Sequence, residues 1–255
     1  MSLSNIKLFK SDNIDALNKI IWETIYNNGN PLHFGSAEEP KDAREIFAVI
    51  QIYGKALKDM YNGKLPKGWK FGEQANQVYI EMLKNPGRGA QPYTYGERLH
   101  RQSVSQKISS LEDDGVVSRS NYSININQIE EHRKMLKRAI DTNIQSNRIW
   151  GDIGKPTDLK LIDPPCFRSW QLRTSERNKV SLRIFMRSSD AGNGYAANLD
   201  AFIRVFVDEV ITPAGGVLEE VIFIAFSEHV YVNDFDMLEM LFGKVPDAIR
   251  KGAVA

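Results

Sequence analysis

The sequence predicts an α+β fold in which helices pack against one large sheet. Segments with the helical spacing of apolar residues and segments with the two-residue alternation of strands are mixed along the chain. They do not follow the regular strand–helix–strand alternation of a doubly wound sheet. At 255 residues, with 42% hydrophobic and 25% charged residues, the chain can bury one large core or two small ones. We expect a single domain over residues 1–255.

The charge balance and the single cysteine narrow the class of protein. A formal net charge of +1 provides no field suited to nucleic acid, so no DNA partner is expected and arginines should meet any phosphate locally. Cys166 has no second cysteine with which to form an internal disulfide. No signal peptide precedes Asp12, and no apolar run approaches the roughly 20 residues of a membrane span. We therefore expect a soluble, cytoplasmic protein without a membrane partner.

The first two thirds of the chain are predicted to contain more helix than strand. Residues 13–26 place apolar side chains on one face behind a cap at Asp12, and Gly29 ends this helix. Residues 28–42 are polar and interrupted by glycine and proline, which is typical of irregular structure. The other predictions here are a strand over 45–53, helices over 72–83, 95–111 and 128–144, turns over 85–92 and 113–115, and a short strand at 116–117.

The last third alternates more clearly between strand and helix. Apolar residues occupy every second position along 179–187, which predicts a half-buried strand. A polar turn with Gly192 and Gly194 follows it, and the chain then enters a helix whose first turn carries Asn198. The remaining predictions are that helix over about 198–210, a turn over 213–216, a strand over 218–226 and a final helix over 234–242 that ends at Gly243.

Cys166 is the first candidate for chemistry. It directly follows Pro164 and Pro165, which hold the preceding backbone extended. A lone cysteine is more often a small buried hydrophobic residue than a nucleophile. Arginines at positions 168, 173 and 187 are close in sequence, however, and an arginine near the sulfur would stabilise the thiolate, which is the reactive form.

Three further polar positions suggest a nucleotide ligand. Arg187 and Ser188 at a strand end form either a solvated corner or a bidentate grip on a phosphate. Asn198 is either a helix cap or an amide that reads a base. An amide offers both a donor and an acceptor to the N3–H and O4 edge of uracil, whereas a carboxylate would suit cytosine.

His229 and Tyr231 form the last candidate pair. They lie two residues apart, so in an extended segment both side chains point to one face and could hold a sugar hydroxyl together. The alternative is a strand-end pair at the surface. The four histidines have no HxxxH-like spacing and no second cysteine accompanies them, so we expect no metal site. Gly192 and Gly194 lack the third glycine of a dinucleotide fingerprint.

Taken together, these motifs resemble one family, the thymidylate synthases. The order and spacing of the motifs carry the resemblance, which is best over residues 147–242. Residues 93–98, Tyr-Thr-Tyr-Gly-Glu-Arg, are similar to the tyrosine–glycine segment of the archaeal branch. The motifs are Pro165-Cys166, Arg187-Ser188 with Asp190, Asn198, and His229-Val-Tyr231-Val-Asn233.

The resemblance implies a fold, a reaction and an assembly. The family fold is a sandwich of helices on a large sheet, and two subunits pack sheet to sheet as a homodimer. The implied reaction adds the Cys166 thiolate to C6 of dUMP, after which C5 takes a one-carbon unit from 5,10-methylenetetrahydrofolate to give dTMP. Asn147 and Arg148 fall where the family carries two arginines that reach the partner subunit's phosphate, so only Arg148 carries over.

The resemblance also implies a role for each site residue. Asp190 corresponds to the aspartate at the folate ring, and Tyr95 to the tyrosine that assists removal of the C5 proton. A catalytic glutamate is expected on an early helix, with Glu73 the first candidate and Glu81 the second. The implied substrate contacts are Arg187, Ser188 and Arg148 to the 5′-phosphate, Asn198 to the base, and His229 and Tyr231 to the deoxyribose 3′-hydroxyl.

Two departures from the family leave alternatives open. Phe167 replaces the usual histidine after the cysteine, and only Trp69 lies where the family has a tryptophan-rich segment. Bulky aromatic side chains there keep water from the one-carbon intermediate. If water enters, the product is hydroxymethyl, so a hydroxymethylase acting on dUMP or on a cytidine nucleotide is the first alternative. A nucleotide-binding or RNA-binding relative without turnover is the second.

Overall fold

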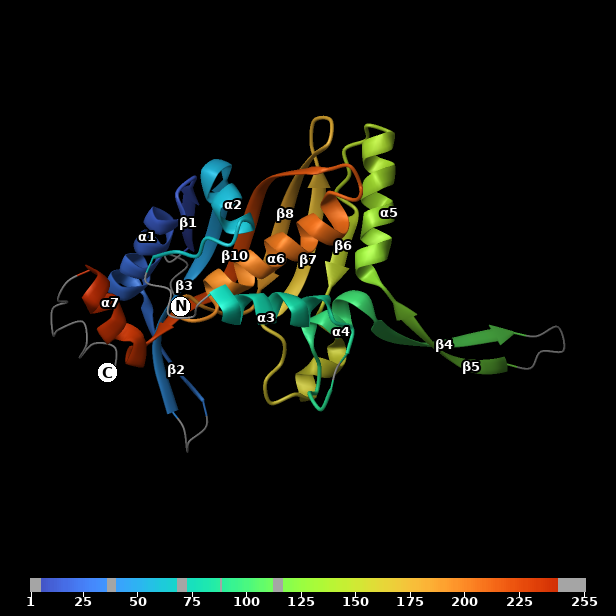
Figure 1. Cartoon of the computed structure of the whole chain (residues 1–255). Helices are drawn as coiled ribbons and strands as arrows, with labels where there is room; N and C mark the ends of the chain where they lie inside the picture. The colour runs from blue at the N-terminus through green and yellow to red at the C-terminus, as the bar shows by residue number, and fades with distance from the viewer. Residues whose placement is uncertain (1–5, 36–39, 68–72, 88, 112–116, 243–255) are drawn as a thin grey trace.

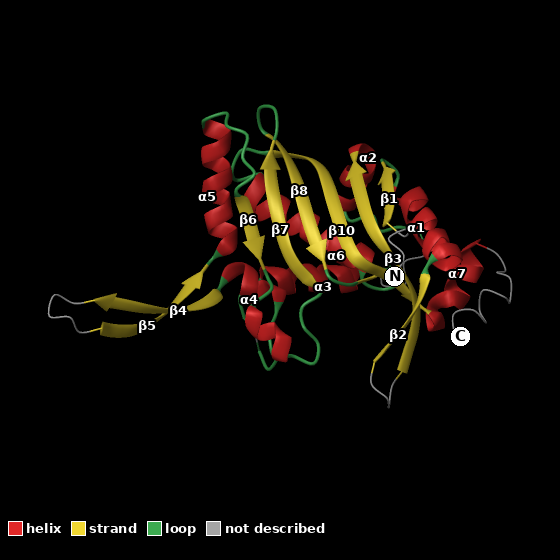
Figure 2. Ribbon diagram, turned by 180° about the vertical axis from the view of Figure 1, so that it is seen from behind, coloured by secondary structure: helices red, strands yellow, loops and turns green. Residues whose placement is uncertain are grey.

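The chain folds into one large mixed sheet whose helices gather on a single face (Figures 1 and 2). The computed structural model describes residues 6–35, 40–67, 73–87, 89–111 and 117–242. The strands are β1 (Ile6–Ser11), β2 (Asn30–Gly35), β3 (Pro40–Tyr53), β4 (Gln102–Leu111), β5 (Val117–Ile126), β6 (Ile149–Asp152), β7 (Phe167–Thr174), β8 (Lys179–Met186), β9 (Ser189–Asp190) and β10 (Val217–Tyr231).

The helices belong mainly to the layer that covers the sheet, and α5 stands beside its β6 edge (Figure 1). No helix among the described residues is long and apolar enough to cross a membrane. The α-helices are α1 (Ile14–Asn28), α2 (Gly54–Tyr61), α3 (Glu73–Lys84), α4 (Tyr95–His100), α5 (Gln128–Asp141), α6 (Tyr195–Phe206) and α7 (Phe235–Phe242). A π-helical turn over Val207–Ile211 continues α6, and 3-10 turns lie at Pro156–Lys160 and Val232–Asp234.

The sheet is built around the long strand β10. Its strand order is β1-β3-β10-β8-β7-β6, with β2 also paired to β3 and β9 to β10. β10 runs antiparallel to β3 but parallel to both β8 and β9. This mixture agrees with the predicted α+β class and with a large mixed sheet.

The two faces of the sheet differ in burial, because strand side chains alternate between faces. Val221 and Phe223 of β10 are fully buried under the helices, and Phe223 packs edge-on against Tyr195 of α6 at 5.3 Å between ring centroids. Ile222 is partly exposed and Phe226 is 57% exposed on the opposite face. In Figure 2 none of the helices in the described part of the chain crosses that face.

The prediction of one helix over residues 95–111 is wrong beyond His100. α4 covers only Tyr95–His100, and the rest forms β4, which pairs with β5 in a two-stranded hairpin that projects from the body (Figures 1 and 2). The β4 segment contains four serines, which disfavour a helix interior, and the β-branched Val104 and Ile108. Val117 of the short strand predicted at 116–117 begins β5, which continues to Ile126. Val116 and the whole predicted turn over 113–115 lie outside the described residues.

Several predicted boundaries also shift. Asn13, not Asp12, caps α1, since its side chain accepts from the backbone N–H groups of Asp15 and Ala16. α5 ends at Asp141, where Asn143 takes a left-handed φ of 50°. The helix predicted from 198 begins three residues earlier, and the segment 28–42 that was predicted to be irregular contains β2 and the start of β3. Gly243 lies outside the described residues.

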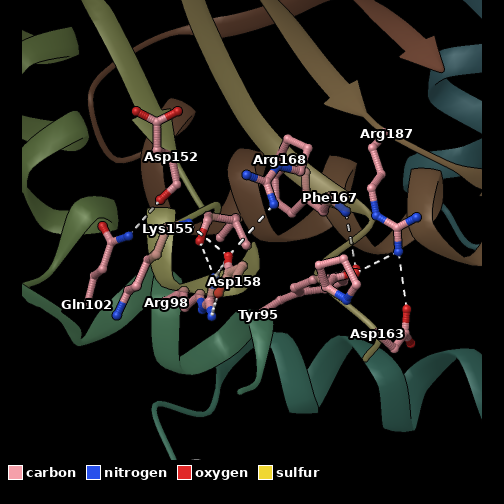
Figure 3. A network of polar contacts seen from close by, with 12 residues as sticks. Tyr95, Arg98, Gln102, Asp152, Lys155, Asp158, Asp163, Phe167, Arg168 and Arg187 are labelled. Carbon is pink, nitrogen blue, oxygen red and sulfur yellow. Dashed lines mark hydrogen bonds and ion pairs between the residues drawn. The ribbon is translucent and has the colours of Figure 1, made fainter. Parts of the chain in front are cut away.

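A buried ion pair fastens α4 to the segment before β7 (Figure 3). Both terminal nitrogens of Arg98 donate to the carboxylate of Asp158 at 2.6 Å, and the two side chains are only 6% and 3% exposed. Arg98 Nη1 also donates to the Ile153 carbonyl at 2.6 Å, and its guanidinium lies 4.7 Å from the Tyr93 ring centroid. The hydrogen bonds from Arg98 hold the pKa of Asp158 below its ordinary value, although burial opposes them.

Asp158→Ala should lower the free energy of unfolding by about 3–5 kcal/mol, because it leaves a buried guanidinium without its counter-charge. Since the folded-state pKa of Asp158 is lowered, this contribution is present above the unfolded pKa of about 3.9 and is lost as the pH falls through the folded value. Urea denaturation from pH 7 to pH 3 measures both effects.

The matched control is Asp141→Ala, which removes the exposed pair between Lys137 and Asp141 on α5. That change should cost about 0.5 kcal/mol or less. Equal losses in the two variants would contradict the structural role given to Arg98 and Asp158.

Candidate functional site

Six of the predicted site residues line one cavity of about 860 Å³. Strand pairing brings them there, because β10 lies parallel to β8 and β9 and all three strands end at the same edge. In this register His229 of β10 is opposite Asp190 of β9, and Phe167 at the start of β7 is opposite Met186 of β8. The six are Cys166, Arg187, Ser188, Asp190, His229 and Tyr231.

Arg187 holds the segment that carries the cysteine (Figure 3). Its backbone N–H donates to the Cys166 carbonyl at 2.8 Å. Its Nη2 donates to the Pro164 carbonyl at 2.7 Å and to Asp163 Oδ1 at 3.1 Å. The Asp163 side chain is 85% exposed, so this ion pair is open to competition by another anion.

The electrostatic surroundings keep the free thiol protonated. Burial raises the pKa of Cys166, the positive charge of Arg187 lowers it, and the negative charge of Asp163 raises it further. Because the thiolate is the nucleophile, the site gains reactivity when Asp163 is moved or neutralised while Arg187 remains.

Tyr95 contacts the backbone next to the cysteine. Its phenolic oxygen accepts from the Phe167 backbone N–H at 3.2 Å, and its ring lies edge-on to Phe167 at 5.7 Å between centroids. Burial raises the pKa of Tyr95. A protonated phenol at this position can relay a proton through its oxygen but is a weak base on its own.

His229 and Tyr231 stand together, as their spacing predicts. Their rings are edge-on with centroids 5.1 Å apart, and Ser188 Oγ lies 3.5 Å from His229 Nδ1. Burial lowers the pKa of His229, against the charge of Asp190, which raises it. A neutral imidazole can donate to or accept from a ligand hydroxyl, which suits a sugar contact.

Asp190 organises the turn between β9 and α6. Its Oδ1 accepts from the backbone N–H groups of Gly192 at 2.9 Å and Asn193 at 3.0 Å, and its Oδ2 accepts from Asn193 Nδ2 at 3.0 Å. Asn193 Nδ2 also donates to Asp234 at 2.8 Å. A carboxylate has about four acceptor positions, so Asp190 retains capacity for one further N–H donor in the cavity.

Asn198 lies in the first turn of α6 and is not among the residues that line the larger cavity. Its Oδ1 accepts from the Tyr79 hydroxyl at 2.6 Å. Tyr79 lines a second cavity of about 430 Å³ together with Tyr93 and Tyr95, and Asp163 lines both cavities. The two cavities therefore meet near Asp163.

Other predicted residues lie elsewhere. Arg148 is exposed next to β6 and does not line the cavity of its own chain. Glu81 is exposed on α3, accepts from Gln77 Nε2 at 3.2 Å, and lines a separate depression of about 350 Å³. The side chain of Glu73 and all of Trp69 lie outside the part of the chain that the structure describes.

Three residues near the site escaped the sequence analysis. Lys41 and Glu45 of β3 line the larger cavity, and Lys41 Nζ lies 5.9 Å from the Tyr231 ring centroid. Tyr79 reaches Asn198 from α3. A charged residue in a polar segment gives no indication in the sequence that it belongs to a site. Only the pairing of β3 with β10 brings Glu45 opposite His229.

A comparison with known families identifies the chain. The family model described as thymidylate synthase matches residues 11–251. This match covers nearly the whole sequence, including every element that lines the two cavities. No curated protein matches the chain.

Glu228 is an unusual buried acid directly behind the cavity. It is 0% exposed and lies opposite Ser189 in the strand pairing, next to His229. Burial raises the pKa of Glu228 well above its ordinary value, the neighbouring Ser189 hydroxyl opposes this, and the charge of Asp190 adds to it. Burial thus favours the neutral carboxylic acid form of Glu228 in the folded protein.

Because the folded-state pKa of Glu228 is raised, its contribution to stability is full below the unfolded pKa of about 4.3 and is lost as the pH rises toward the folded value. Glu228→Gln should remove this loss, so the variant should gain stability relative to the native chain between pH 5 and pH 8. Urea denaturation across that range measures the difference. Glu219→Gln, an exposed change on the same strand, should keep the native pH dependence, and an unchanged slope in Glu228→Gln would contradict the neutral assignment.

Proposed function

Because the chain belongs to the thymidylate synthase family, we propose that it converts dUMP to dTMP through a covalent adduct between Cys166 and C6 of the base. The family supports one-carbon transfer to dUMP in general. The observation that carries the proposal for this chain is the gathering of six predicted site residues around one cavity, with the thiol and the arginine on the same wall.

Arg187 and Ser188 would hold the 5′-phosphate. A phosphate monoester carries up to two negative charges, so it competes well with the single exposed carboxylate of Asp163 for the Arg187 guanidinium. The phosphate would bring its own negative charge to the same guanidinium, so the exchange by itself does not lower the pKa of Cys166.

The bond changes can be followed atom by atom. After the thiol loses its proton, Sγ of Cys166 forms a bond to C6, and the electron pair of the C5–C6 double bond moves to C5 and O4. Asn198 Nδ2 would donate to O4 as negative charge develops there. C5 would then form a bond to the one-carbon unit of the folate and lose its proton, and Tyr95, whose oxygen lies next to the cysteine segment, would assist that proton transfer. Release of the folate would break the bond between its nitrogen and the one-carbon unit, and hydride from the folate would complete the methyl group. Cleavage of the bond between Sγ and C6 would restore the C5–C6 double bond and the thiolate.

The second cavity fits a folate. Aromatic side chains of Tyr79, Tyr93 and Tyr95 provide flat surfaces for a ring system. Asp190 lines the adjoining larger cavity, and its remaining acceptor capacity would suit a ring N–H of a folate that extends into it. When bound, 5,10-methylenetetrahydrofolate supplies the one-carbon unit and, for dTMP, the hydride.

Hydroxymethylation is the second candidate, and the polar lining of the second cavity favours it. Phe167 does not decide between the two reactions, because this side chain is fully buried and packs on Phe202 and Tyr95. The second cavity is lined by tyrosines, whose hydroxyl groups can hold water. Water in place of hydride would give a hydroxymethyl product.

A homodimer would cover the open face of the sheet. That face carries two aromatic pairs, Trp150 with Phe185 and Phe47 with Phe226, at 5.1 Å and 5.3 Å between ring centroids. Trp150 and Phe226 are 42% and 57% exposed in the single chain. Burial of such side chains against a second copy is favourable. Arg148 would then reach the phosphate site of the partner.

Product analysis from dUMP and from dCMP with 5,10-methylenetetrahydrofolate tests the function. We expect dTMP from dUMP, and a hydroxymethyl nucleotide would support the second candidate instead.

Cys166→Ala should abolish turnover but change nucleotide affinity by no more than about tenfold, or 1.4 kcal/mol, because addition follows binding. The native chain should form a covalent complex with 5-fluoro-dUMP and the folate that is visible by mass spectrometry. Turnover by Cys166→Ala would contradict the covalent mechanism. Binding of dUMP without formation of the covalent complex would indicate a non-catalytic relative.

Mixing two inactive variants tests the shared site. Arg148→Ala and Cys166→Ala subunits should regenerate part of the activity when they exchange, because one hybrid site then contains both groups. Fluorescence transfer between labelled subunits controls for exchange. Exchange without recovered activity would place Arg148 outside the phosphate site.

A further inference from the structure

We propose that Tyr79 is a positioning residue that makes the site select uracil over cytosine, by holding the side-chain amide of Asn198 in one orientation. The inference rests on the proposed function, since it assumes that Asn198 faces the base. It goes further, because it assigns the origin of base choice to a residue of α3 that does not itself need to touch the nucleotide.

The contact between the two side chains is short and sheltered. The Tyr79 hydroxyl donates to Asn198 Oδ1 at 2.6 Å across the junction of α3 and α6. Asn198 is half-buried in the first turn of α6. Among the described residues, Asn198 Oδ1 is the acceptor found for the phenolic proton.

A second polar contact keeps the two helices in register. Asn76, three residues before Tyr79 and therefore one turn away on the same face of α3, donates to the carboxylate of Asp200 on α6. Asp200 is 0% exposed and also accepts from Arg204 Nε at 3.0 Å. These buried contacts fix α3 against α6, so the Tyr79 hydroxyl cannot follow Asn198 freely if the amide turns.

The donors and acceptors of the two side chains then favour one orientation of the Asn198 amide. A phenol has one proton to donate, and burial raises the pKa of Tyr79 well above its ordinary value, so the proton stays in place. With Oδ1 toward Tyr79, that proton has an acceptor. A flipped amide would present Nδ2, which is a donor, and the buried phenolic proton would lose its partner.

The fixed orientation matches uracil. Oδ1 has a second lone pair that can accept from N3–H of uracil, and Nδ2 can donate to O4. Cytosine has no proton at N3 and carries an amino group at C4, so it would require the flipped amide. Tyr79 thus penalises cytosine through Asn198, even though the amide alone could serve either base.

Binding of dUMP and dCMP without folate tests the inference, because it separates recognition from turnover. Titration calorimetry should give the native chain a preference for dUMP of at least about 30-fold. Tyr79→Phe, which removes only the hydroxyl, should reduce that preference about five- to tenfold. Tyr93→Phe is the matched control: Tyr93 lines the same cavity but is not the donor to Asn198. Any change in affinity that it causes should be equal for both nucleotides.

A double-mutant cycle shows whether Tyr79 acts through Asn198. In an Asn198→Ala background, Tyr79→Phe should cause no further change in the ratio of affinities. An unchanged ratio in Tyr79→Phe, an equal fall in Tyr93→Phe, or a further fall in the Asn198→Ala background would each overturn the inference. If the native chain prefers dUMP and Tyr79→Phe keeps the same preference, this inference alone is refuted. If the native chain binds neither nucleotide, the proposed function is refuted as well.

Discussion

The parallel pairing of β10 with β8 and β9 is the constraint on which the site depends. Parallel strands end at the same edge of a sheet, so the residues that follow β8 and the residues near the end of β10 must meet there. This one arrangement places Arg187 near His229 and sets Asp190 directly opposite His229, across more than 35 residues of intervening chain. Cys166 joins them because β7 runs antiparallel to β8 and therefore starts where β8 ends.

Buried polar contacts between elements then hold the helices that line the second cavity. The bidentate pair of Arg98 and Asp158 anchors α4, which carries Tyr95. The contact of Asn76 with Asp200 anchors α3, which carries Tyr79. Buried charges are costly unless they are paired, so such contacts contribute little net stability but strongly disfavour other arrangements of these helices. The helices that line the second cavity are therefore fixed by polar geometry as well as by apolar packing.

The electrostatics of the cavity centre on Arg187. In the free chain Arg187 is shared between the Pro164 carbonyl and the Asp163 carboxylate, and burial keeps the Cys166 thiol protonated. A phosphate would compete with Asp163 for the guanidinium. Arg187 would thus bind the substrate, and its positive charge also favours the thiolate form of Cys166, which is the nucleophile.

Sequence alone determined the mixed fold class, the strand from Lys179 to about Arg187, the helix that carries Asn198, and six of the residues that line the larger cavity. These features depend on local periodicity and on motifs whose order along the chain is itself informative. Sequence could not separate α4 from β4, because a short helix followed by a hairpin has no apolar face long enough to show its period. Nor could it identify Lys41, since a single charged residue in a polar segment has no pattern.

Tertiary structure alone decided which distant groups act on one another. The contact between Tyr79 and Asn198 joins positions 119 residues apart, and the pKa of Glu228 is raised because the fold buries its carboxyl group completely. Local sequence specifies which hydrogen bonds a side chain can make, but not which partner it meets. That choice is made by the packing of elements across the sheet, which is why the site residues could be named from the sequence while the means of orienting them could not.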